Sequence, residues 1–326
     1  MIRAMSNLFE KIKNARKVLE TGDPRLEGEA VGADGGALPK GMEEVDGPNS
    51  MLLGAVRVAH KEGLEALNNN ALTLARSRFT EATESLLQAG GKDTALHAVL
   101  LNLLGVTFRR ARMAPEALAA FRGALEVDEQ LDPADPTQYA VHLNNLAGLY
   151  QEMEWNDLAK PLMEQVVALD LELLGETHPQ TGSHMNNLGC LLFELGEYEP
   201  AEHWLQRAVE VGEALWAGGN PQLAVRLSNL ALVRQQQQKE GESERLLRES
   251  LAICETRHPP TSLQRAAVQY NLSRVLGAQS SPAARTEALK LAAEATRTLQ
   301  GQLGLEHPQS QRVKAQEAHL TALLEG

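Results

Sequence analysis

The sequence predicts an all-α protein built as a stack of helical hairpins. Three observations support this fold class: an asparagine that recurs at a nearly constant interval, small residues that keep the same phase, and prolines that mark the start of several hairpins. The composition agrees, because only 4% of the 326 residues are aromatic, whereas aromatic and β-branched residues dominate strands. Hydrophobic residues make up 43% of the chain, which is enough to bury a core.

The repeat is clearest in an asparagine that is followed by leucine. It occurs in LLNLLGV, HLNNLAGLY, HMNNLGCLL, RLSNLALVR and QYNLSRVL, and successive copies are 43, 42, 42 and 42 residues apart. Two places after the asparagine the residue is small in four of the five copies, with Leu104 as the exception. A fixed period of this length predicts a solenoid, because one hairpin cannot cover its own apolar face and neighbours must stack. The anchor asparagines are Asn102, Asn145, Asn187, Asn229 and Asn271.

Each repeat contains two helical segments. Apolar residues recur at helical spacing from Gln138 to about Glu152, and after a short break a second helical run extends from Leu158 to Leu174. Prolines such as Pro136 stand 34 places after an anchor. They mark the start of the next helix, where a missing N–H costs nothing.

The phase predicts six hairpins and a closing helix over residues 51–326. We expect a few extra residues, 279–283, between the two helices of the sixth hairpin, and a single polar-faced helix over residues 309–324 that closes the stack. In chain order the hairpins are expected to begin near Met51, Thr94, Thr137, Gln180, Gln222 and Thr261.

The repeat resembles a known family. LNNLAGLY, ELGEYEPAEHWLQRAVEV and LGETHPQTG are similar to the kinesin-light-chain class of tetratricopeptide repeat, which has a longer, 42-residue unit. The likeness is good over residues 94–308 and loose over residues 51–90. It implies a right-handed superhelix whose first helices line a concave groove, and a ladder of asparagines that hydrogen-bonds the backbone of an extended peptide. Carried over to this sequence, the ladder consists of the five anchors, Phe108, Phe193, Leu232 and Tyr270 supply apolar pockets, and Arg109 and Arg274 are the nearby cations.

The sequence departs from the family in two ways, and these limit the kinds of partner that the resemblance implies. No set of Lys and Arg residues that would grip a terminal carboxylate is evident beside the anchors. The long heptad coiled coil of cargo-linked light chains also has no counterpart here, so association with a motor is not expected. The anchors themselves have a second interpretation: an amide has donors and an acceptor, so each could bridge adjacent helices within the stack. The two roles are compatible.

Charge and motifs limit the function classes. Asp and Glu number 43 against 31 Lys and Arg, for a net charge of −12; such a surface repels phosphate backbones, and we expect a basic or neutral partner rather than nucleic acid. No phosphate-binding glycine loop, paired-histidine zinc motif or nucleophile elbow is present. We therefore expect no enzyme activity, cofactor or metal, and instead a scaffold or adaptor that binds an extended peptide or amphipathic helix of another protein. A self-associating architectural solenoid and a peptide-responsive regulatory sensor remain alternatives, and the oligomeric state stays open.

The N-terminal segment has a different composition. Residues 1–20 predict an amphipathic helix with Leu8, Ile12, Ala15 and Leu19 on one stripe. Residues 21–50, rich in Gly, Pro and acidic residues, predict a flexible tether. The helix could dock on the protein's own groove, on a partner or on an anionic membrane surface, or have no role.

Cysteine use and hydropathy predict the compartment. Cys190 and Cys254 are expected to be buried free thiols in a reducing environment. The longest apolar stretch, residues 99–108, is interrupted by Asn102 and is far shorter than the ~20 residues of a membrane span. No secretion signal is evident. We therefore expect a cytoplasmic protein.

Overall fold

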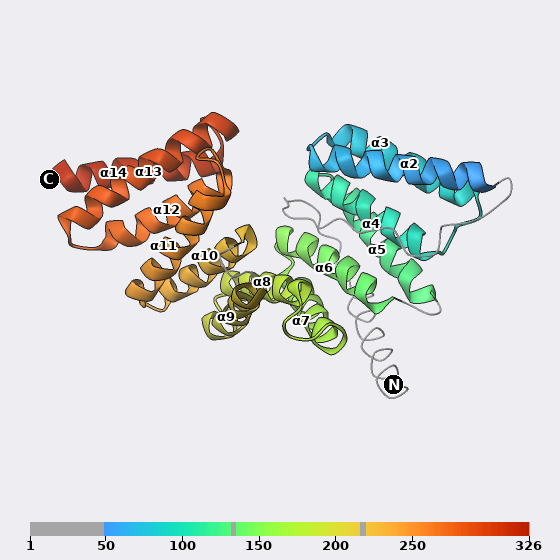
Figure 1. The fold of residues 1–326 in the computed structure, drawn as a ribbon, viewed down its shortest axis with the longest axis horizontal. Coiled ribbons are helices and arrows are strands. Elements are labelled where there is room, and N and C mark those ends of the chain that lie inside the picture. The colour runs from blue at the N-terminus through green and yellow to red at the C-terminus, as the bar shows by residue number, and fades with distance from the viewer. Residues whose placement is uncertain (1–48, 132–134, 216–219, 326) are drawn as a thin grey trace. The chain divides into compact units, whose positions relative to one another are not determined.

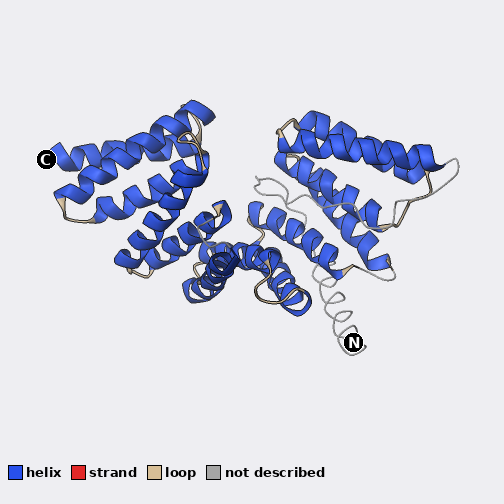
Figure 2. Cartoon of the chain, in the orientation of Figure 1, coloured by secondary structure: helices blue, strands red, loops and turns tan. Residues whose placement is uncertain are grey.

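The computed structural model describes residues 49–131, 135–215 and 220–325. Within these ranges every regular element is an α-helix and no strand occurs (Figure 2). Thirteen helices, α2 to α14, follow one another in this part of the chain as adjacent hairpins (Figure 1). The predicted fold class, an all-α solenoid of stacked hairpins, is confirmed. The predicted N-terminal helix and nearly all of the tether lie outside the described residues.

The six hairpins start within two residues of their predicted positions. The first helices of the hairpins are α2 (Asn49–Asn68), α4 (Ala95–Arg110), α6 (Pro136–Glu152), α8 (Pro179–Glu194), α10 (Pro221–Gln236) and α12 (Leu263–Ala278). The second helices are α3 (Leu72–Gln88), α5 (Ala114–Gln130), α7 (Asn156–Leu173), α9 (Tyr198–Leu215), α11 (Glu240–Arg257) and α13 (Pro282–Leu303), and α14 (Pro308–Glu325) is the closing helix.

The predicted insertion in the sixth hairpin is misplaced. The turn from Ala278 to Pro282 is as long as the turn from Gln236 to Glu240, so no residues are added between α12 and α13. Instead α13 has 22 residues, against 18 in α11. The extra residues extend the second helix, because its Ala- and Leu-rich sequence favours a further helical turn.

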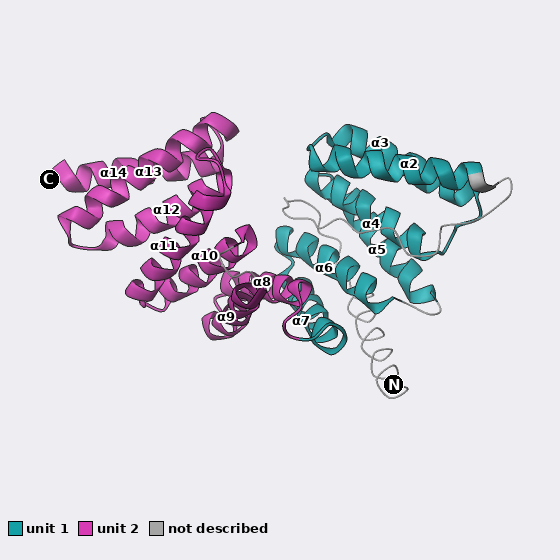
Figure 3. Cartoon of the chain, viewed as in Figure 1, with its two compact units in different colours: residues 1–175 teal, residues 176–326 magenta. Residues whose placement is uncertain are grey.

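The contacts divide the chain into two compact units, residues 1–175 and residues 176–326 (Figure 3). Described helices α2 to α7 belong to the first unit and α8 to α14 to the second. Each unit is described by itself below. The handedness of the superhelix stays a prediction.

The ends of the helices follow the sequence signals. Pro136, Pro179 and Pro221 are each the first residue of a helix. The residue before the proline accepts hydrogen bonds from free backbone N–H groups, as in Asp135, whose side chain accepts from Thr137 N and Gln138 N. These caps fix where each first helix begins.

One residue in each of the first five hairpin turns has a left-handed backbone. The five residues are 42 positions apart, have φ between 56° and 76°, and only one of them is glycine. The stack therefore holds ordinary side chains in a conformation that costs each of them roughly 1–2 kcal/mol. These residues are Asn70, Arg112, Glu154, Gly196 and Gln238.

A small residue in each first helix allows the second helix to pack closely against it. A Cβ atom added to Gly105 would lie 2.5 Å from the Phe121 ring, and one added to Gly63 would lie 2.6 Å from the Phe79 ring. Since the phenylalanines are fully buried, they occupy the space that a larger residue would need. The small residues form an unbroken 42-residue series: Gly63, Gly105, Ala147, Gly189, Ala231 and Ser273.

This series corrects the phase of the second repeat. Its small residue is Gly105 and not Leu104, so the true counterpart of the other anchors is Leu103. Asn102 lies one residue earlier, in the phase of Asn144 and Asn186. The first interval of 43 residues in the sequence therefore joins two different positions of the repeat.

Adding one methyl group tests this packing. We expect Gly105→Ala to lower the free energy of unfolding by about 1–3 kcal/mol, because the new Cβ overlaps the buried ring of Phe121. Urea denaturation measures the change. Gly123→Ala in α5 is the matched control: its nearest neighbour would be Leu101 Cδ1 at 3.5 Å, an ordinary contact, and helix propensity alone predicts a gain of up to about 1 kcal/mol. Equal effects of the two changes would refute the close-packing account.

Candidate functional site

Consecutive first helices within a unit are joined by hydrogen bonds from the anchor amides. Asn145 Nδ2 donates to Asn102 Oδ1 at 2.9 Å, linking α6 to α4. Asn229 Nδ2 donates to Asn186 Oδ1 at 3.0 Å, linking α10 to α8. Asn271 Nδ2 donates to Ser228 Oγ at 3.2 Å, linking α12 to α10. Bridging between helices, the second interpretation of the anchors, is thus present for four of them.

The three bonds share a register that differs from the sequence period. Each joins residues 43 positions apart, whereas equivalent positions are 42 apart. An anchor therefore meets the residue that precedes the equivalent position on the neighbouring helix. The same 43-residue register recurs in Gln264 Nε2, which donates to the Pro221 carbonyl oxygen at 2.8 Å.

The first unit covers its anchors. Asn102 and Asn145 are only 2% and 3% exposed. Beside them the buried Arg109 guanidinium pairs with the largely buried Glu152 carboxylate, Nη2 to Oε1, at 2.7 Å. The same guanidinium lies 3.1 Å from the place of a Cβ on Gly148. Arg109, predicted as a groove cation, is therefore held in an ion pair between α4 and α6, while Phe108 is partly exposed.

Burial controls the electrostatics of this pair. Loss of water raises the pKa of Glu152 to about 7, and the charge and hydrogen bonds of Arg109 act in the opposite direction. The stabilisation of the ionised carboxylate by Arg109 therefore offsets only part of the effect of burial on the pKa of Glu152. The Arg109 guanidinium also fills the space beside Gly148.

The second unit leaves the corresponding surface open. Positions four before, at and three after each anchor are all partly or largely exposed on α8, α10 and α12, and Val225 reaches 39%. Adjacent members of this helix series contact each other directly, so the positions form one surface of unit 2. We name it the ladder face: Ser183, Asn187, Cys190, Val225, Asn229, Leu232, Ala267, Asn271 and Arg274.

The ladder face includes some of the predicted groove residues and not others. Leu232 and Arg274 belong to it, with the anchors Asn187, Asn229 and Asn271. Phe193 lies near the hairpin turn, with its ring centroid 5.8 Å from that of Tyr198.

Tyr270 contributes to the core as well as to the surface. It is partly buried against a cluster of Ala266, Ala295, Leu299 and Val313. The guanidinium of Arg274 lies 5.9 Å from the centroid of the Tyr270 ring, within the range of a cation–π contact.

Sequence reasoning missed Cys190, Ala267 and Asn186. Cys190 was expected to be buried but is partly exposed, whereas Cys254 is buried as expected. Cys190 lies three positions after the anchor Asn187, and Ala267 lies four positions before the anchor Asn271. Because these spacings place residues on the same helix face as the anchor, the sequence could have identified both. Asn186 required the 43-residue contact register, which the sequence period does not reveal.

The negative charge of the chain lies away from the ladder face. Helices α8, α10 and α12 contain one acidic residue, Glu194, whereas α9 and α11 contain nine. Arg226 is buried and donates to the Ala208 carbonyl oxygen at 2.9 Å. Arg274 is the charged member of the ladder face. The net charge therefore does not favour a basic ligand at this surface.

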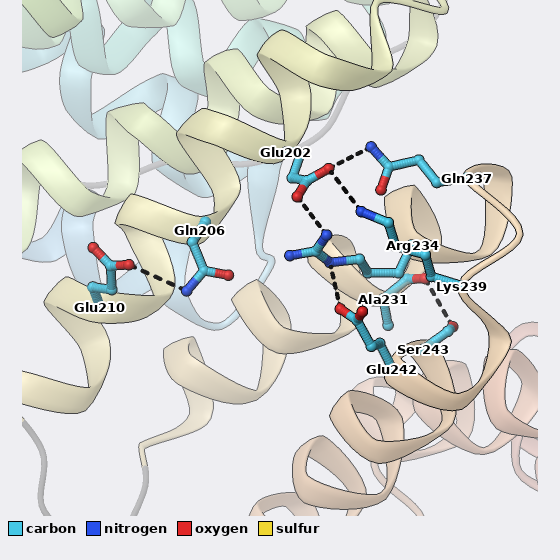
Figure 4. Close-up of polar contacts among 9 residues, drawn as sticks. All are labelled: Glu202, Gln206, Glu210, Ala231, Arg234, Gln237, Lys239, Glu242 and Ser243. Carbon is cyan, nitrogen blue, oxygen red and sulfur yellow. Dashed lines mark hydrogen bonds and ion pairs between the residues drawn. The ribbon is translucent and has the colours of Figure 1, made fainter.

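A polar network fixes the C-terminal end of α10 (Figure 4). Glu202 of α9 accepts hydrogen bonds from Arg234 and Gln237, and Lys239 Nζ lies 3.7 Å from it. Arg234 Nε also lies 3.2 Å from a carboxylate oxygen of Glu242. Burial opposes ionisation of Glu202, but the hydrogen bond from Gln237 and the nearby positive charges outweigh it, so the pKa of Glu202 is lowered. The network ties α10 to α9 and α11 beside the ladder face.

Neither a metal cluster nor a membrane span is found in the described ranges. No three His, Cys, Asp or Glu side chains of the described residues are grouped as they would be around a metal ion. Among the described helices, none combines the length and the apolar character needed to cross a membrane.

The stacked hairpins with a 42-residue period define a class of helical repeat protein, and the comparisons identify the repeat. Models of the tetratricopeptide repeat family match residues 138–214 and 223–260. The chain is a tetratricopeptide repeat protein with repeats of the 42-residue, kinesin-light-chain type. Such scaffolds are generally protein–protein interaction modules and are typically non-catalytic. No curated protein matches the sequence.

Solved structures share the fold at low sequence identity. BtubC (BKLC) from P. vanneervenii is 17% identical, with a TM-score of 0.52 over 84% of this chain and 92% of that one. The apo form of RapI is 15% identical, with a TM-score of 0.58 over 83% and 99% of the two chains. A Rap protein complexed with Competence and Sporulation Factor is 11% identical, with a TM-score of 0.56 over 83% and 76%. At these identities the likeness concerns the fold alone.

Removing one partner of the buried ion pair tests the closure of the first unit. We expect Arg109→Met to lower the free energy of unfolding by about 3 kcal/mol at pH 8, because the largely buried Glu152 carboxylate loses its bond to the Arg109 guanidinium. The pKa of Glu152 in the folded protein then rises further above its normal value of 4.5, so the folded state favours the protonated carboxyl. The contribution of this group to the free energy of unfolding is therefore complete below pH 4.5 and is lost as the pH rises. Urea denaturation at pH 5 and pH 8 should show the larger loss at pH 8.

The double change Arg109→Met with Glu152→Met is the matched control. It removes both charges of the pair, so most of the stability should return and the difference between pH 5 and pH 8 should disappear. A loss from Arg109→Met that is the same at both pH values would contradict this account.

Proposed function

We propose that this protein is a non-catalytic scaffold that binds an extended peptide segment of another protein along the ladder face. One observation carries the proposal: three neighbouring helices present the same three positions, all partly or largely exposed, with an asparagine at the centre of each set. Amides pair with the backbone of any peptide, because they offer both donors and an acceptor. Neighbouring side chains then select the sequence.

The spacing of the helices suits an extended chain. Packed helices are about 8–10 Å apart, and an extended peptide advances about 3.3 Å per residue. Successive anchors would therefore meet about every third peptide residue. A segment of roughly seven residues would cross from Asn187 to Asn271.

The side chains around the anchors define the preferred ligand. Val225 and Leu232 on α10 offer apolar surface for one peptide side chain near the middle of the segment. Arg274 favours a carboxylate over a basic group at the α12 end. A largely uncharged peptide with one apolar residue in the centre fits this surface best.

Bridging between helices does not prevent peptide binding. Asn229 donates through one N–H to Asn186, which leaves its other N–H and one side of its carbonyl oxygen for a ligand. The bridge also fixes the rotamer of the amide, so less conformational entropy is lost on binding. A Rap protein of the same fold was crystallised with a peptide factor, which supports the capacity of the fold for such ligands.

Replacing two anchors tests the proposal. Peptides selected from a random 12-residue phage-displayed library on the full chain provide the probe, and calorimetry measures their dissociation constants. We expect Asn187→Ala with Asn229→Ala to weaken binding at least tenfold, because two sets of backbone hydrogen bonds are lost. The helical circular dichroism signal should be retained.

Asn186→Ala is the matched control for this test. It removes the acceptor of the α8–α10 bridge while leaving both anchor amides in place. Binding should fall much less with this change than with the double change. Equal losses would assign the anchors a purely structural role, and selected peptides that bind the double variant with unchanged affinity would exclude the ladder face as the site.

A further inference from the structure

The outer side of α2 has no described neighbour. In the later hairpins the first helix packs against the second helix that precedes it, as α6 does against α5 and α10 against α9. One position of the repeat makes this contact: His142 Nδ1 lies 2.6 Å from Asp128 Oδ2 of α5, and Arg226 donates to the Ala208 carbonyl oxygen of α9. Both side chains are at most 2% exposed.

The same position in α2 is open to solvent. Val58, which is 84 residues before His142, is 57% exposed. Ala55 is exposed as well, although its counterparts Tyr139 and Leu223 are buried. Met51, one turn earlier, is 84% exposed. The N-terminal half of this helix face is therefore apolar and uncovered among the described residues.

The C-terminal half of the same face is acidic. Glu62 and Glu65 replace core residues of later repeats, as in Leu146 and Leu149, which are at most 1% exposed. Glu62 pairs with Arg78 at 2.9 Å, and Glu65 lies 3.9 Å from Lys61. Both pairs are largely solvent-exposed, so these carboxylates remain accessible to a further cation. A ligand for this face needs apolar groups together with positive charge.

We propose that residues 3–20 of the same chain dock on this face of α2 and take the place of the missing preceding helix. Their sequence has the required chemistry: an apolar stripe of Leu8, Ile12, Ala15 and Leu19, and five basic residues against two acidic ones. As a helix these 18 residues are about 27 Å long, against about 30 Å for α2. A solenoid also needs a cap that covers the apolar surface of its terminal repeat.

The connection between the two segments permits this docking. Residues 21–48, which are most of the predicted tether of residues 21–50, join α2 at Asn49, two residues before Met51. A flexible chain of 28 residues has a root-mean-square span of about 30 Å, comparable with the length of α2. Tethering at this length gives an effective concentration on the order of millimolar, so even a weak contact is well populated.

Thiol labelling at position 58 tests the proposal in the full-length chain. Val58→Cys places a thiol on an exposed site, so the fold is retained, and Cys190→Ser removes the other accessible thiol, since Cys254 is fully buried. A maleimide reagent then reports on coverage. We expect Leu8→Asp with Ile12→Asp to raise the labelling rate at least tenfold, because charges on the stripe prevent docking.

The matched control adds the same charge to the opposite side of the segment. Ser6→Asp with Asn14→Asp lies off the apolar stripe, so the labelling rate should stay within about twofold of the parent. Equal rates in the parent and the stripe variant would overturn the proposal. Protection of the thiol that vanishes on dilution would also overturn it and would indicate that a second copy of the chain covers this face. Protection seen only with vesicles containing 30% phosphatidylserine would overturn it as well and would indicate a membrane surface.

Discussion

The close approach of the two helices in each hairpin is the contact on which the stack depends. It requires a small residue on the first helix wherever a large side chain of the second helix enters, as Phe121 does at Gly105 and Leu205 at Gly189. Both large side chains are almost completely buried. Because the interior is packed at the density of a crystal, Gly105 and Gly189 cannot accept a methyl group without a shift of their neighbours. This contact fixes the phase of every repeat, and with it the direction in which each first helix presents its side chains.

The anchors have a structural role that does not depend on any ligand. A contact register of 43 residues on a period of 42 brings three of the anchor amides, those of Asn145, Asn229 and Asn271, against a polar side chain of the preceding first helix. Buried amides need such partners, since an unsatisfied donor costs roughly 1–3 kcal/mol. The asparagines thus help to align the helices in both units. In the second unit they are also partly exposed, so the same side chains remain available at the surface.

The two units use the same repeat position differently. In the first unit Gly148 leaves space that the Arg109 guanidinium fills, and Glu152 neutralises it. In the second unit the equivalent positions hold Cys190, Leu232 and Arg274, which leave the surface open. An internal ion pair therefore fills the space beside Gly148 in the first unit, whereas Cys190, Leu232 and Arg274 are partly exposed at the equivalent positions of the second unit. The proposed peptide contact therefore lies in the second unit.

The sequence by itself determined the all-α fold, the hairpin starts and the 42-residue class of repeat, because helix periodicity, N-terminal prolines and small residues are local signals. It also identified the asparagines as special, although it assigned Asn102 to the wrong phase. Only the tertiary structure decided which of them stay exposed, because burial depends on residues 43 positions away, such as Arg109 and Glu152. The offset between contact register and sequence period arises from how neighbouring helices slide past each other, and no pattern within one repeat records it. For the same reason, only the structure shows that one side of α2 is uncovered: Val58 is exposed, whereas His142 and Arg226 at the equivalent positions are buried.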